Sequence, residues 1–212
     1  MKKTLGRKML GLILMAGFAL VLTSCRKEQN VGKMNSIEAE AENGLGNAYG
    51  QTDISTCAPI PEILNVPEGN KLVLQTFAKG VQIYEVKRKA TDPNAFEWVN
   101  IAPSATLYAK PEFVNPLIDH FAGPSWQFIK GPEKGETVVA TRSQGITVDQ
   151  TAIQWLLLEA VKDRSTPDNK ITFVQRICTV GGLAPTTVPS EANLGQIDST
   201  PYTASYLFYE KN

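Results

Sequence analysis

The sequence is poor in the two residue types that most often bind metals or cross-link a chain. Its 212 residues include one histidine, His120, and three cysteines, Cys25, Cys57 and Cys178. A histidine-rich metal site cannot be built from this inventory, and a disulfide-dense scaffold needs more cysteines. We therefore expect no metal site.

An excess of positive charge is missing as well. The 21 basic residues equal the 21 acidic ones in number, and four of the basic residues lie in an N-terminal segment that we expect to be removed. What remains is 17 basic against 21 acidic side chains, a net charge of about −4. Nucleic-acid binding depends on clustered Lys and Arg side chains that neutralise phosphates, so nucleic acid is not an expected partner.

Long apolar runs are also absent. The chain begins with a basic stretch, residues 1–8, followed by 14 mostly apolar residues, 9–22. Spanning a bilayer core of about 30 Å takes about 20 helical residues, so a permanent transmembrane anchor is the weaker interpretation. A basic segment followed by a short apolar one is typical of a bacterial secretory signal peptide, residues 1–24.

The end of this segment, Leu22-Thr23-Ser24-Cys25, resembles a lipobox, the site that lipoprotein signal peptidase recognises. The resemblance implies that Cys25 becomes the lipidated first residue of the mature chain; the alternative is an ordinary signal peptide that ends near a cysteine. Two or three acyl chains hold a protein stably on a membrane. We expect a membrane-anchored protein of the bacterial cell envelope, with the outer membrane favoured over the inner.

Residues 25–57 comprise Cys25 and a polar stretch rich in Glu, Asn and Gly. Such a composition buries too little apolar surface to offset the entropy of ordering, so it predicts a flexible tether. Overall, 42% of the side chains are hydrophobic and 20% are charged, which is typical of a globular protein with one core. We place that domain at residues 58–212.

Strand signals dominate the domain. Short segments rich in β-branched and aromatic residues, bounded by Gly, Pro and Asn, lie at 71–77, 81–87, 96–101, 137–141, 171–178 and 202–209. They predict a single all-β domain, an antiparallel β-sandwich or a flattened barrel. Residues 78–81 predict a tight hairpin, with Gly80 at the turn. In the last segment Tyr202, Ala204, Tyr206 and Phe208 share one side, which we expect to be buried while the other is partly exposed.

Several motifs together resemble a known family. They are Val66–Leu72, Gly80–Glu85, Ala102–Tyr108, His120–Trp126, Ile153–Leu158, Gln175–Pro185 and Pro201–Tyr209. In this order they resemble the domain of unknown function 3455 family of secreted bacterial and fungal proteins, over residues 61–209. The resemblance implies envelope or extracellular residence and transfers no activity.

Residues 153–161 are ambiguous. Their apolar positions fit a helical stripe completely, but residues 155–158 also read as a buried strand. The resemblance favours the strand, because relatives tend to carry proline just before the tryptophan. We therefore predict a strand.

The cysteines depart from the family pattern. Relatives usually have cysteine at the position of Val86 and again among residues 186–188, and both are absent here. Once Cys25 is lipidated, Cys57 and Cys178 remain and can form a disulfide. The alternative is a free Cys57 in the tether and a buried Cys178 that packs as a small apolar residue.

Candidate catalytic groups are few. Asp119, His120 and Ser125 have the residue types of a nucleophilic triad, but adjacent residues of a strand point to opposite faces and no Gly-x-Ser-x-Gly motif is present. An acid/base pair for glycoside cleavage could draw on carboxylates. The candidates are Glu85, Glu97, Asp119 and Glu159. No phosphate-binding loop or other cofactor motif is present, so no cofactor is expected.

Aromatic side chains provide the best binding signal. We expect Trp98 and Trp155 to be mainly core residues, whereas Trp126 and His120 flank a Gly-Pro turn that can present them together. The sequence thus predicts a non-catalytic binding or structural module. Its partners would be the membrane, through Cys25, and an envelope polysaccharide or protein. The alternative is an envelope hydrolase of glycan or ester bonds that uses His120 and a nearby carboxylate.

Overall fold

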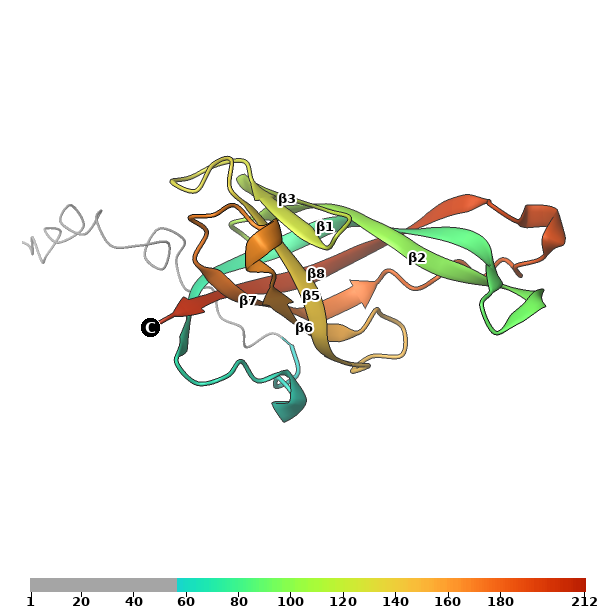
Figure 1. Cartoon of the computed structure of the whole chain (residues 1–212), viewed down its shortest axis with the longest axis horizontal. Helices are drawn as coiled ribbons and strands as arrows, with labels where there is room; N and C mark the ends of the chain where they lie inside the picture. Colours follow the sequence, from blue (N-terminus) through green and yellow to red (C-terminus); the bar gives the residue numbers. More distant parts are fainter. Residues whose placement is uncertain (1–56) are drawn as a thin grey trace, which may run out of the picture. The chain divides into compact units, whose positions relative to one another are not determined.

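The computed structural model describes residues 57–212 (Figure 1). The predicted signal peptide, the lipidation site Cys25 and the tether up to residue 56 lie outside this part of the chain. Within it, no helical segment has the length and apolar character needed to cross a membrane.

Eight antiparallel strands form a closed barrel in which each strand pairs with the next and the last pairs with the first (Figure 1). The strands are β1 (Asn70–Lys89), β2 (Asp92–Tyr108), β3 (Pro116–Phe121), β4 (Ser125–Phe128), β5 (Thr137–Ile146), β6 (Trp155–Ala160), β7 (Ile171–Gly181) and β8 (Ile197–Lys211). Three short 3₁₀ turns accompany them: η2 (Glu62–Leu64), η3 (Lys162–Arg164) and η4 (Glu191–Asn193). The all-β prediction is confirmed, in its barrel form.

The two faces of β8 explain how the barrel is packed. Tyr202, Ala204, Tyr206 and Phe208 belong to the interior core, as their alternation predicts. The opposite face is more buried than expected: Leu207 is fully buried, in a second apolar cluster. That cluster lies outside the barrel wall, so both sides of this wall are covered.

The segment before β1 makes this second cover. Leu64 of η2 packs against the outward side chains of β6, β7 and β8. Gln175 donates a hydrogen bond to the Leu64 carbonyl oxygen at 2.6 Å, and the Tyr209 hydroxyl donates to Gln175 at 2.6 Å. A disulfide joins Cys57 to Cys178, with 5.7 Å between their Cα atoms. The segment is therefore attached by apolar contact, by hydrogen bonds and covalently.

A bulge in β7 directs Cys178 towards Cys57. The pairing of β7 with β8 shifts between Ile177 and Val180, and Cys178 has a φ of 52°. A bulge adds a residue to one strand and reorients the side chains beside it. As a result both Ile177 and Cys178 pack in the outer cluster, while the Thr179 hydroxyl donates to the Ile153 carbonyl oxygen.

The predicted hairpin at residues 78–81 is wrong. These residues lie in the middle of β1, where Gly80 pairs with Ala105 of β2 and with Tyr202 of β8. A Cβ atom at Gly80 would overlap the Ser104 carbonyl oxygen and Ala105. The glycine is thus needed for close approach of two backbones rather than for a turn.

The strand expected within residues 153–161 is present as β6. Trp155 and Leu157 belong to the outer cluster, whereas Leu158 belongs to the interior core and Leu156 packs against it. Apolar cover on both sides explains why this strand lacks the usual alternation and resembles a helical stripe. Strands β3 and β4, which are six and four residues long, were not predicted.

Removing the disulfide tests how strongly residues 57–66 stabilise the barrel. We expect a Cys57→Ser/Cys178→Ser variant to lose about 3 to 5 kcal/mol of unfolding free energy, because the bridge closes a loop across a sequence separation of 121. Urea denaturation of the oxidised protein and the variant measures the difference. Equal midpoints, or two alkylatable thiols at these positions in the untreated protein, would contradict it.

Candidate functional site

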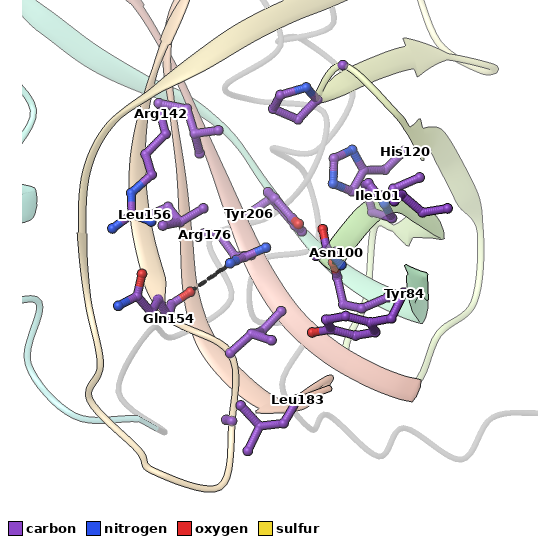
Figure 2. Close-up of a pocket in the computed structure, with 18 of the residues that line it drawn as sticks. Tyr84, Asn100, Ile101, His120, Arg142, Gln154, Leu156, Arg176, Leu183 and Tyr206 are labelled. Atoms are coloured by element: carbon purple, nitrogen blue, oxygen red, sulfur yellow. Dashed lines mark hydrogen bonds between the residues drawn. The ribbon is translucent and has the colours of Figure 1, made fainter. Parts of the chain in front are cut away.

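One pocket of about 650 Å³ extends from the interior core to the surface of the barrel (Figure 2). Its deep part includes Trp126, Leu158 and Tyr206, all of which are buried core residues. Its lining also includes Ile101 and Leu183, which are exposed. The pocket is therefore open to solvent on one side and bounded by the core on the other.

An aromatic cluster forms one wall of this pocket. The hairpin of β3 and β4 pairs His120 with Trp126, and their rings are stacked with centroids 4.6 Å apart and planes 3° apart. Tyr206 of β8 meets both rings edge-on, at 5.2 and 5.8 Å. The two residues selected from the sequence are thus brought together, but inside the barrel rather than on an exposed turn: Trp126 is 1% exposed.

The hydrogen bond of His120 defines its tautomer. Its Nδ1 lies 2.9 Å from the Ser125 carbonyl oxygen, which can only accept, so Nδ1 carries the proton and Nε2 keeps a lone pair. Burial lowers the pKa of His120 to about 3; the bond to Ser125 raises the pKa, and the nearby positive charge of Arg176 lowers it further. At neutral pH the ring is an uncharged hydrogen-bond acceptor at Nε2.

A cation lies in the middle of the pocket. Arg176 of β7 projects into it, and its Nε and Nη2 donate to the Gln154 carbonyl oxygen at 3.2 and 2.9 Å (Figure 2). It takes no part in the ion pairs of the described residues, Lys87–Glu85 and Arg88–Glu191. Burial raises the pKa of the Tyr206 hydroxyl, and the positive charge of Arg176 opposes that rise.

A second cation, Arg142 of β5, lines the exposed part of the pocket. Gly145, on the same strand, leaves room for its guanidinium. A Cβ atom at Gly145 would lie 2.5 Å from Arg142 Nη2 and 2.7 Å from Leu156 Cδ2. Within residues 57–212, no Asp or Glu lines the pocket, so all its formal charge is positive.

Two buried donors in the pocket wall have no hydrogen-bond partner among the described residues. They are Nε2 of Gln82 and Nε1 of Trp126. The other amide atom of Gln82 is satisfied, because Oε1 accepts from Asn100 Nδ2 at 2.9 Å. An unsatisfied buried donor costs about 1 to 3 kcal/mol, so these two groups are unfavourable for stability as the structure stands.

The remaining sequence candidates lie away from the pocket. Asp119 follows Ile118 and precedes His120 in β3, so its side chain points out of the barrel, where it accepts from Thr106 Oγ1 at 3.4 Å. The candidate carboxylates Glu85, Glu97 and Glu159 do not line the pocket either. In the described part of the chain, no three His, Cys, Asp or Glu side chains are grouped so that they could hold a metal ion.

The tryptophans outside the pocket have structural contacts. Trp155 is buried in the outer cluster, as expected. Trp98 is not a core residue: it is only partly buried and belongs to neither apolar cluster, and its Nε1 donates to the Thr187 carbonyl oxygen at 2.8 Å.

Sequence reasoning missed both arginines of the pocket, although each carries a recognisable signal. Arg176 lies two residues after buried Val174, and Arg142 lies two residues after buried Ala140. Residues two apart on a strand share a face, so each arginine continues an apolar, inward face. A charged residue on such a face indicates a polar cavity.

These features define a class of protein: a closed antiparallel β-barrel with a small-molecule-sized pocket to whose lining residues 57–212 contribute two arginines and no acidic side chain. The family is then clear from the sequence. Residues 67–210 match the model described as protein of unknown function (DUF3455), and the chain belongs to that family. No curated protein and no solved structure matches the chain.

The single histidine allows a direct test of the buried ring. In ¹H–¹⁵N spectra of the histidine side chain we expect a neutral Nδ1–H ring from about pH 7.5 down to pH 4.5, because its pKa is about 3 rather than 6.5. His120 binds a second ring proton more readily in the unfolded chain than in the folded one. Protonation of the unfolded chain therefore lowers the free energy of unfolding as pH falls below about 6.5, by up to about 1.4 kcal/mol per pH unit. A titration midpoint near pH 6.5 would mean a solvated ring.

Proposed function

We propose that this protein binds one small molecule in the barrel pocket and does not transform it. The observation that carries the proposal is the pocket of about 650 Å³ that reaches the interior core. Ligand sites usually measure about 300 to 1,000 Å³, with apolar and aromatic walls and a few polar groups that orient the ligand. The aromatic cluster of His120, Trp126 and Tyr206, and the two unpartnered donors, match that description.

The chemistry of the pocket favours binding over hydrolysis. An efficient general base has a pKa near the working pH and usually a partner that orients it. The pKa of His120 is about 3, and its Nδ1 bonds a backbone carbonyl rather than a carboxylate. With Asp119 on the outer face of β3, no acid/base pair supports the hydrolase alternative.

The proposed location is the bacterial cell envelope, preferably the outer membrane, with the barrel attached through lipidated Cys25. The support is the sequence alone: a basic start, a short apolar run and Leu22-Thr23-Ser24-Cys25.

A pocket-filling variant tests the binding function. Leu156 lines the pocket, whereas Leu72 is an exposed leucine outside it. We expect full-length protein to bind the neutral probe N-phenyl-1-naphthylamine with increased probe fluorescence, one molecule per chain. Leu156→Trp should weaken binding at least about tenfold by occupying the space, and the control Leu72→Trp should leave it unchanged.

The same titration can refute the function. Probe binding that is absent, or equal in the Leu156→Trp variant and the control, would remove the pocket as the binding site. Circular dichroism of both variants shows whether the barrel is intact.

Lipidation has its own test in cells. We expect radiolabelled palmitate to be incorporated into the protein and Cys25→Ala to abolish the label, because only the Cys25 thiol can form the thioether to diacylglycerol at this site. The Cys57→Ala variant serves as the control and should keep the label. Labelling of the Cys25→Ala protein equal to that of the unaltered protein would contradict the anchoring proposal.

A further inference from the structure

The charge of the pocket is opposite to that of the rest of the protein. The expected mature chain carries more acidic than basic side chains, yet the charged residues that line the pocket are Arg142 and Arg176. Arginine is charged at every relevant pH. Arg176 is partly buried, and no carboxylate among the described residues that line the pocket compensates its charge.

The guanidinium of Arg176 is held in place but not saturated. Two of its five N–H groups donate to the Gln154 carbonyl oxygen, and of the other three one lies within reach of the Tyr206 hydroxyl, whose pKa this contact lowers. The bonds to Gln154 use Nε and Nη2, which leaves the Nη1 group and one N–H of Nη2. Two such N–H groups side by side match the two oxygens of a carboxylate.

The other polar groups suit the same kind of ligand. Gln82 Nε2 and Trp126 Nε1, in the wall of the pocket, are buried donors without partners among the described residues. The unused acceptor is Nε2 of His120, which would take a hydroxyl or amine hydrogen at the far end of the ligand. The lining also includes the apolar side chains of Ile153 and Leu156, against which an apolar or aromatic body can pack.

We propose that the ligand is a small organic monoacid whose carboxylate binds Arg176 and whose apolar or aromatic body lies against Trp126 and Leu156. This inference rests on the proposed binding function. The planar guanidinium of Arg176 matches the two oxygens of a carboxylate, which is why we assign a carboxylate rather than a phosphate to this position. Arg142, in the exposed part, attracts the acid from solution.

Three competitors with one ring system provide the test. Full-length protein carrying N-phenyl-1-naphthylamine is titrated with 2-naphthoate, with its neutral amide 2-naphthamide and with 2-naphthyl phosphate. We expect the carboxylate to displace the probe about 10 to 100 times more effectively than the amide, the range for hydrogen bonds to a charged group. The phosphate should be weaker than the carboxylate.

Substitutions then assign the preference to one residue. Arg176→Met removes the charge and keeps an unbranched stem, and it should bring the carboxylate-to-amide ratio close to one. Arg176→Lys keeps the charge without the fork and should retain part of the ratio. Arg164→Met, at an exposed arginine in η3 outside the pocket, is the matched control and should leave the ratio unchanged.

Each outcome has a defined reading. An amide as effective as the carboxylate, or no displacement by any competitor while the probe still binds, overturns the acid inference and leaves the binding function standing. A phosphate stronger than the carboxylate overturns the carboxylate assignment. A carboxylate-to-amide ratio that is undiminished in the Arg176→Met variant overturns the role of Arg176. If that variant does not fold, the comparison of carboxylate with amide in the unaltered protein still decides. Failure of the probe itself to bind overturns both proposals.

Discussion

Closure of β8 onto β1 is the constraint on which the rest of the structure depends. A closed eight-stranded barrel has no free edge, and its interior is just wide enough to be filled by side chains or to hold one small ligand. In this barrel one part of the interior is filled by side chains and another part is open. Phe128, Phe208 and their neighbours fill one part, while the pocket beyond Trp126 and Tyr206 is open. The candidate site is thus the part of the barrel that its own side chains leave unfilled.

The same closure sets what the outer surface must do. Residues 57–66 cover the apolar outer face of β6, β7 and β8, and the disulfide attaches them beside the β7 bulge. The bulge has two effects: it turns Cys178 outward, and it places Thr179 where its hydroxyl meets the Ile153 carbonyl, next to the pocket. Strand β7 therefore both attaches residues 57–66 to the barrel and helps to shape the pocket.

Local patterns predicted the fold class but not the barrel's details. Large apolar residues alternate along β8 because one face of the strand is buried, so this strand can be predicted from the sequence. Gly80 looked like a turn, because a sequence does not reveal whether a glycine provides a positive φ or allows close contact with Ala105. Within the site, His120 and Trp126 could be selected from their turn, whereas Arg176 acquires its meaning only when closure places it inside. Which residues lie inside the barrel depends on strand pairing between distant parts of the chain, and local sequence patterns do not show that pairing.

The polar groups that line the pocket are better explained by a bound ligand than by a contribution to stability. Replacing a buried charged or unsatisfied polar group by a well-packed apolar one is often neutral or stabilising, so stability alone would favour a filled, apolar interior. The chain instead keeps Arg176 without a carboxylate partner in the described residues, and keeps Gln82 Nε2 and Trp126 Nε1 without acceptors. Natural sequences break local rules mainly at functional sites. The unpartnered charge of Arg176, in a pocket with no acid in its described lining, is what favours an anionic ligand over a neutral one.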